Sequence, residues 1–272
     1  MGHCAVKNPA AGGGRWVEVP PERLVTWIVM FAQRHGGVTL DGPVTPDETG
    51  AAVTFTAADG ATAECHPPFP PVLPVGPAAP AAPAAAETAE TEPAATVRAA
   101  AEALAAYAAA DRTVGVLLVR LGGYAVGVFS GSPPALAASK TGSRPVHGRS
   151  AAGGWSQQRF ARRRENQAAT ALRAAADAAA GVFGRYGADQ LDAVILGGDK
   201  RSAAGLRDDS RLEKYLAKAT GRFLTVPDPR LTVLRDTPRA FLATRIRLTE
   251  PESVGPAGRL PSRLDAMLLT SD

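Results

Sequence analysis

Two glycines followed closely by two glutamines are the residues whose types and spacing could do chemistry. The group runs Gly153-Gly154-Trp155-Ser156-Gln157-Gln158. A helix start that presents Gly-Gly and Gln is suited to reach a phosphate-rich cleft, because glycine has no side chain to keep a ligand away from the backbone. The alternative is a flexible entry to a helix, with Ser156 as the N-cap and both glutamines solvated. Taken by themselves, these six residues favour the alternative.

The surroundings of this group carry charge of one sign. Between Asp111 and Glu165 there is no acidic residue. The basic residues of that interval are Arg112, Arg120, Lys140, Arg144, Arg149, Arg159, Arg162, Arg163 and Arg164. Such a run repels itself unless an anion is near, and Arg and Lys release condensed counterions when they dock on phosphates. The pattern predicts a polyphosphate partner, since a solvated charge run would more often mix both signs.

Other catalytic signatures are missing. The chain has neither GxGxxG nor GxxxxGK[ST], so no standard nucleotide-binding loop is predicted. His147 and Ser150 could be read as a base and a nucleophile, but no carboxylate lies nearby in the sequence to orient the histidine. A serine hydrolase is therefore disfavoured.

Metal chemistry is also disfavoured, and no cofactor is predicted. His3-Cys4 and Cys65-His66 offer soft ligands without the CxxC or HxxxH spacing that preorganises a metal site. A nuclease on an RNase-H-like sheet would need clustered carboxylates, and its loose candidates are Asp192, Asp199 and Asp208.

Composition sets the remaining limits. The 272 residues suffice for one or two domains, and the formal net charge of +4 means that the basicity is local. No stretch is apolar enough for a membrane span, and the N-terminus lacks the apolar core of a signal peptide. With only two cysteines, the chain is expected to be cytoplasmic.

The first part of the chain is predicted to be a small α+β module over residues 1–66. A strand is expected at 15–19, a helix from Pro20-Pro21 to His35, and strands from Val38, at 51–57 and at 61–65. Residues 67–95 are rich in proline and alanine and are expected to form an extended linker.

A second unit is predicted over residues 96–250, followed by a tail at 251–272. Helices are expected at 96–110, 156–186 and 209–219, and strands at 113–121, 124–130, 136–140, 143–147, 191–196, 223–226 and 241–248. The helix after the glycine loop would bury Phe160, Leu172, Ala175, Ala179, Val182, Phe183 and Tyr186. Hairpin, long helix, buried strand, helix and strand indicate an α/β sandwich.

Gly153-Gly154-Trp155-Ser156-Gln157, with the basic helix that follows, resembles the catalytic loop of the actinobacterial release-factor-like peptidyl-tRNA hydrolases. These proteins are similar to the eukaryotic ankyrin-repeat and zinc-finger peptidyl-tRNA hydrolase and to the middle domain of the eukaryotic class-one release factor. The match covers roughly residues 96–248, and residues 15–36 also resemble that family's N-terminal region.

The resemblance implies a release-factor middle-domain-like (RNase-H-like) sandwich that hydrolyses the ester between a nascent peptide and tRNA. In that family a glutamine in a G-x-x-Q pattern places water at the ester carbonyl, and Gly154-Trp155-Ser156-Gln157 fits the pattern. The release factor itself has Gly-Gly-Gln without a gap, so Gln157 and Gln158 both remain candidates. Gly153 and Gly154 would allow close approach of the tRNA end.

The expected partners are peptidyl-tRNA and the rRNA of stalled large ribosomal subunits, in ribosome-associated quality control, with no membrane and no DNA. The residues expected to bind RNA phosphates are Arg144, Arg149, Arg159, Arg162, Arg163 and Arg164. The competing hypothesis is a ribosome- or RNA-binding factor without catalytic activity that uses the same basic loop.

Overall fold

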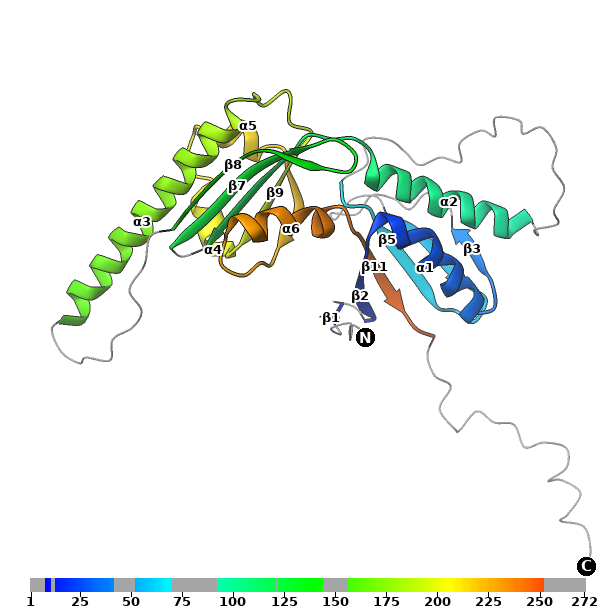
Figure 1. The fold of residues 1–272 in the computed structure, drawn as a ribbon. Helices are drawn as coiled ribbons and strands as arrows, with labels where there is room; N and C mark the ends of the chain where they lie inside the picture. Colours follow the sequence, from blue (N-terminus) through cyan, green and yellow to red (C-terminus); the bar gives the residue numbers. More distant parts are fainter. Residues whose placement is uncertain are drawn as a thin grey trace, which may run out of the picture.

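The computed structural model describes residues 8–10, 13–41, 52–69, 92–120, 122–143 and 156–251, with the backbone alone for residues 8–9, 41, 92–93 and 156–166 (Figure 1). Two β-sheets with helices packed on them make a mixed α/β fold. Among the helices of these ranges, none combines the length and the apolar character that a membrane span requires.

The first sheet has six strands, and every neighbouring pair is antiparallel. In spatial order the strands are β1 (Asn8–Pro9), β2 (Arg15–Val19), β11 (Thr244–Thr249), β5 (Thr62–His66), β4 (Val53–Ala57) and β3 (Val38–Asp41). Alternate residues such as Val17, Val19, Ile246 and Leu248 face the core, as the period of two in a strand requires.

Two helices cover one face of the first sheet, α1 (Pro21–Arg34) and α2 (Glu92–Ala109). Pro21 suits the first turn of α1, and Leu24, Ile28 and Phe31 recur at helical spacing on its buried side. The helix ends at Arg34, and Gly36 and Gly37, which follow the C-cap residue His35, both have positive φ.

The second sheet has five strands, in the order β10 (Ala219–Leu224), β9 (Ala193–Gly198), β6 (Val114–Arg120), β7 (Gly123–Ser130) and β8 (Ala135–Ser143). β10, β9 and β6 are parallel, whereas β6, β7 and β8 form an antiparallel meander. The mixed sheet therefore has three parallel strands whose carboxyl ends lie at one edge.

Helices cover both faces of the second sheet. One face carries α3 (Ser156–Phe183), α4 (Lys200–Gly205) and α5 (Glu213–Leu216), and the other carries α6 (Leu231–Phe241) together with Phe69. In β9, Val194 and Leu196 face α3 while Ala193 and Ile195 face α6. Burial on both faces explains why this strand reads as an unbroken apolar run.

Three features connect the two sheets. The last strand, β11, lies between β2 and β5, so the chain returns to the first sheet after completing the second. Phe69, three residues after the end of β5 in the first sheet, packs against Phe241 in the core of the second sheet. Arg222 on β10 is buried and pairs with Glu18 on β2, with 3.1 Å between Nη2 and Oε1, and it also donates to the carbonyl of Ala243.

These connections bear on the expected division of the chain at residues 67 and 95. The range expected to form the second unit, 96–250, contributes Val97, Ala101 and Leu104 of α2 and all of β11 to the first core. Within the range expected to be a linker, Phe69 is buried and α2 begins at Glu92. Each core thus draws residues from both sides of the expected boundaries.

Most predicted elements are confirmed within a few residues, including the 15–19 strand, the hairpin turn at Asp59-Gly60 and the β6–β7 hairpin. The single helix expected at 209–219 is wrong: that range holds only the short α5, and α4 precedes it. Of the strand expected at 143–147, only Ser143 is described, and it is the last residue of β8. Residues 144–147 lie outside the described ranges.

No element was expected between residues 226 and 241, yet helix α6 forms there although Pro238 lies inside it and proline cannot donate to the carbonyl four residues earlier. That carbonyl belongs to Leu234, and the hydroxyl of Thr237 donates to it at 2.7 Å. A side chain thus replaces the missing backbone donor, and the helix continues to Phe241.

Candidate functional site

The residues expected to take part in catalysis or RNA binding lie in the segment between β8 and α3 and in the first turns of α3. Gly153, Gly154, Arg144 and Arg149 fall outside the described residues. The backbone of α3 includes six further candidates, whose side chains are outside the description: Gln157, Gln158, Arg159, Arg162, Arg163 and Arg164. The two glutamines follow Ser156 in the first turn of the helix. The structure therefore describes the two elements that flank residues 144–155, β8 and α3, and we call these two elements the frame.

One side of this frame is the carboxyl end of β8. The strand remains paired with β7 up to its last residue, where Ser143 lies opposite Gly123. The preceding residue, Gly142, lies beneath the ring of Tyr124, and a Cβ at position 142 would come within 2.5 Å of that ring. A glycine at position 142 therefore leaves room for the tyrosine ring over the end of the strand.

The other side of the frame is α3. The predicted stripe is confirmed from Leu172 to Tyr186, all in or against the core of the second sheet, whereas Phe160 lies among the residues whose side chains are not described. Leu172 packs so closely that a Cβ on Gly205 would come within 2.7 Å of it. Alanines at 175, 176, 178 and 179 let the helix lie close to the strands.

The amino-terminal part of α3 projects beyond this contact, as Figure 1 shows. Leu172 comes 16 residues after Ser156, which at a rise of about 1.5 Å per residue is a distance of about 24 Å. The first turn of α3 is thus carried at the end of a long helix whose other end is fixed in the core.

The carboxyl ends of the parallel strands lie at the edge of the sheet from which β8 leaves. Val119 of β6 is opposite Gly198 of β9, and Gly198 has a φ of +103°. A Cβ there would come within 2.1 Å of the carbonyl oxygen of Val119. The next backbone N–H, of Asp199, donates to that same oxygen at 2.8 Å. Glycine is therefore required for β9 to turn into α4 at this point.

Asp199 is used to cap α4. Its carboxylate accepts from the Oγ of Ser202 at 2.7 Å and from the backbone N–H of Ser202 at 2.9 Å. These hydrogen bonds, with the hydroxyl contribution the largest, lower the pKa of Asp199 below its usual value. The carboxylate is therefore ionised and already engaged in holding the strand-to-helix turn.

The three carboxylates considered for a nuclease do not come together. Asp192 precedes β9 and accepts from the backbone N–H of Thr113 at 2.7 Å, while Asp199 follows the same strand. The seven residue steps from Asp192 to Asp199 along the strand correspond to about 23 Å. Within the described ranges, no three His, Cys, Asp or Glu side chains are grouped so that they could hold a metal ion.

The soft ligands considered earlier are also separated. Cys65 faces the first core, where burial raises the pKa of its thiol, whereas His66 points to the opposite face, against Trp16 and Glu64. The residues His3, Cys4, His147 and Ser150 lie outside the described ranges.

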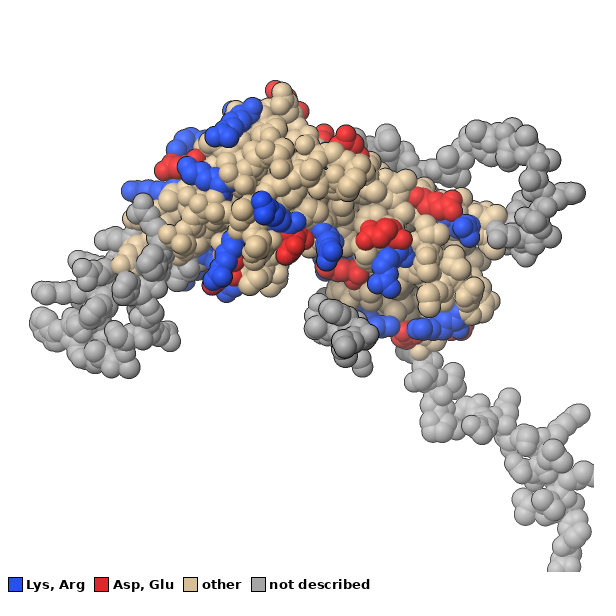
Figure 2. Space-filling model, in the orientation of Figure 1, with Lys and Arg blue, Asp and Glu red and all other residues tan. Residues whose placement is uncertain are grey.

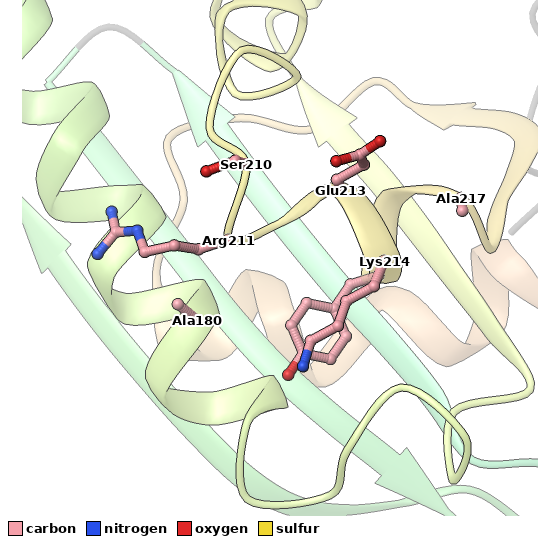
Figure 3. A pocket seen from close by; sticks show the side chains of 7 residues that line it. Ala180, Ser210, Arg211, Glu213, Lys214 and Ala217 are labelled. Atoms are coloured by element: carbon pink, nitrogen blue, oxygen red, sulfur yellow. The ribbon is translucent and has the colours of Figure 1, made fainter.

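A surface pocket lies between α3 and α5, far from the first turn of α3 (Figure 3). Its lining includes Ala180, Arg211, Lys214 and Tyr215. Arg211 pairs there with Asp177 and Asp209, and Lys214 lies over the ring of Tyr215. Ala180 is 24 residues along α3 from Ser156, or about 36 Å, so the pocket belongs to the opposite end of the helix.

The structure also brings forward residues that sequence reasoning missed. Lys200, Arg201 and Arg230 are exposed at the same edge as Arg120. The signal for the first two was present, because Gly197-Gly198-Asp199-Lys200-Arg201 directly follows the apolar run at residues 191–196 that predicts a buried strand.

The family model described as Actinobacteria/chloroflexi VLRF1 release factor matches residues 112–247. No curated protein sequence matches the chain.

Among solved structures, the crystal structure of the archaeal translation termination factor aRF1 is 11% identical, with a TM-score of 0.35. The match covers 80% of this chain and 61% of the archaeal one. A second structure, described only as an archaeal protein, is 12% identical with a TM-score of 0.27, and the match covers 82% of this chain and 62% of that one. The chain thus spans less than two thirds of the length of either.

Proposed function

Because the chain belongs to the Actinobacteria/chloroflexi VLRF1 release factor family, we propose that it is a peptidyl-tRNA hydrolase that releases nascent peptides from stalled large ribosomal subunits. The observation that carries the proposal is the extent of the match. Residues 112–247 include the whole interval between β8 and α3, and therefore the sequence Gly154-Trp155-Ser156-Gln157.

The proposed reaction is attack of water on the ester carbonyl between the peptide and the tRNA. The ester is already activated, so a strong base is not needed, and placing the water accounts for much of the acceleration. The Gln157 amide would orient the water, and N–H donors of the loop would stabilise the oxyanion that develops on the carbonyl oxygen. This chemistry requires no metal and no cofactor.

The frame supports this mechanism by fixing both ends of the loop. Ser143 is held by its pairing with β7, and α3 is held by its apolar contacts from Leu172 onward. A glutamine in the first turn of a helix anchored in this way can reach into a narrow cleft of the substrate complex while the sheet stays outside that cleft. Gly153 and Gly154 would leave room for the tRNA end.

The basic residues of the loop and of the first turns of α3 would bind RNA phosphates and orient the loop without reading sequence. They are Arg144, Arg149, Arg159, Arg162, Arg163 and Arg164. The second sheet, with its antiparallel meander and parallel strands, would correspond to the RNase-H-like middle domain of class-one release factors. A protein acting on ribosomes in this way would work in the cytoplasm.

The test is peptide release from a purified complex of peptidyl-tRNA and large ribosomal subunit. Gln157→Ala should lower the maximal release rate by about 100- to 1000-fold, the usual effect of losing one group that stabilises such a transition state. Its binding to the complex should be unchanged. Gln158→Ala, one residue further along the same helix turn, is the matched control and should retain release.

The other outcomes have definite meanings. Loss of release in Gln158→Ala alone would move the catalytic role to that residue. Binding by the wild-type protein with no release would instead favour a ribosome-binding factor without catalytic activity, for which the acid-free basic run between Asp111 and Glu165 is the specific support.

A further inference from the structure

Four exposed basic residues form a second group, separate from the basic loop and the start of α3. We call Arg120, Lys200, Arg201 and Arg230 the strand-end group, since Arg120 is the last residue of β6 and the other three come after the ends of β9 and β10. We propose that the strand-end group binds the phosphate backbone of RNA and orients the glutamine loop on its substrate. This inference rests on the proposed function for its choice of RNA.

The first three members are neighbours because β6 and β9 are parallel and in register. Val119 lies opposite Gly198, so Arg120 on one strand and Asp199 on the other leave the sheet side by side. Neighbouring strands are about 4.8 Å apart, and Lys200 and Arg201 directly follow Asp199. The hydrogen bond from Asp199 N–H to Val119 holds this turn against β6.

The fourth member is brought to the other side of Arg120. The guanidinium of Arg120 donates from Nη1 to the carbonyl of Val226 at 3.2 Å, which holds the segment after β10 across the strand ends. That segment reaches β7, because a Cβ on Gly123 would come within 3.7 Å of Cδ of Pro229. Arg230, the next residue, therefore lies beside the start of β7.

The group leads toward the candidate loop. Gly123 is opposite Ser143, the last described residue before position 144. From β9 through β6 and β7 to β8, the edge spans three strand spacings, or about 14 Å. A small anion would occupy one part of such a line, whereas a polyphosphate chain can follow it to the loop.

The charge balance of this edge favours an anionic partner. None of the four side chains forms an ion pair with a carboxylate elsewhere in the described part of the chain. The acidic residues on the same segments are Asp199, which accepts from Ser202 and whose charge interacts with Arg120, and Asp228, so two acidic residues face four basic ones. Figure 2 shows Lys and Arg side chains, with some Asp and Glu side chains among them, on the half of the molecule that carries the second sheet.

The test compares two triple variants of the full-length protein that lose the same charge. One is Lys200→Gln/Arg201→Gln/Arg230→Gln, which leaves Arg120 in place because it also holds Val226. The matched control is Arg23→Gln/Arg34→Gln/Arg185→Gln, three exposed arginines away from the strand ends. The probes are deacylated tRNA and, in a separate arm, large ribosomal subunits free of tRNA.

We expect the strand-end variant to bind RNA at least about tenfold more weakly at 150 mM salt, and the slope of log K against log salt to fall by about 2 to 3. The control variant should match the wild type in both quantities. Weaker binding to tRNA alone would identify the tRNA backbone as the source of the phosphates, and weaker binding to the subunits alone would identify rRNA.

Equal RNA binding by the strand-end variant and the control in both arms would overturn the inference, as would a wild-type protein that binds neither probe. Peptide release is measured on the same samples. Normal Gln157-dependent release with equal binding would reject the strand-end group and leave the proposed hydrolase intact. Absent release with a clear binding difference would reject the hydrolase and retain the RNA surface.

Discussion

At the scale of single residues, the edge that would meet RNA depends on one glycine. Gly198 has a backbone conformation that other residues rarely adopt, and the carbonyl of Val119 leaves no space for a side chain. The obstacle is backbone rather than a flexible side chain, so it cannot simply move aside. The turn that exposes Lys200 and Arg201 is therefore tied to this residue.

Gly198→Ala should lower the free energy of unfolding by about 2 to 3 kcal/mol, from backbone strain and the displaced strand together. Gly221→Ala is the matched control, because no atom lies within 4 Å of a Cβ there and its φ is not positive. That change should stay within about 0.5 kcal/mol of the wild type. Urea unfolding measures both, and equal stabilities would contradict the role given to Gly198.

The same scale shows what residue patterns can and cannot predict about the site. The glutamines, glycines and loop arginines were found because they stand together in the sequence. Arg230 was not, because its place beside β7 depends on Pro229 packing near Gly123, more than 100 residues away in the chain. A group assembled from three strand ends has no local signature.

At the scale of elements, α3 combines a fixed half with a projecting half. The fixed half relies on alanine, whose small side chain lets the helix lie close to β7 and β8. A change in the distance between α3 and these strands would tilt the whole helix. Because Ser156 lies far from Leu172 along the helix axis, a small tilt at Leu172 would produce a larger displacement at Ser156. The position of the glutamines is therefore sensitive to packing far away from them.

Ala179→Leu tests this dependence. Ala179 is fully buried, so three added carbons should destabilise the protein by about 1 to 3 kcal/mol and displace the helix. Peptide release should fall while binding of deacylated tRNA persists, since no proposed RNA contact is altered. Ala169→Leu, an exposed change of the same size on the same helix, should affect neither. Full release by a destabilised Ala179→Leu protein would argue against the positioning role of α3.

The elements also show where sequence patterns suffice. Helix α3 was predicted because its apolar residues recur at helical spacing over several turns. Helix α6 was not, because Pro238 reads as a break unless Thr237 is known to satisfy the carbonyl of Leu234. Local compensation of this kind depends on a side-chain rotamer, which the residue pattern does not contain.

At the scale of the whole molecule, the two sheets share their chain. The alternation of apolar and polar residues in 241–248 correctly indicated a strand. Such alternation identifies the buried face of a strand but not the strands that pair with it. β11 pairs with β2 and β5, which come from the other end of the sequence. Grouping it with the strands that precede it was the natural inference from sequence order.

A chain that ends after Ala243 should therefore lose the first sheet. Ile246 and Leu248 are buried, and losing both removes about 3 to 6 kcal/mol of apolar burial, comparable with the whole stability of many domains. Amides of β2 and β5 should then exchange rapidly with deuterium. A chain that ends after Pro251 keeps every described element and should keep their protection; equal protection in both would contradict the closing role of β11.

The place of β11 has a consequence for how the protein is made. Ribosomes synthesise chains from the amino terminus, so β2 and β5 leave the tunnel long before their shared neighbour does. Until residue 249 has emerged, both strands have an open edge, the kind of surface that invites pairing with other chains. The second sheet can assemble in the meantime, but the first must wait for nearly the last described segment. A protein proposed to act on stalled synthesis would thus itself be vulnerable to a stall late in its own translation.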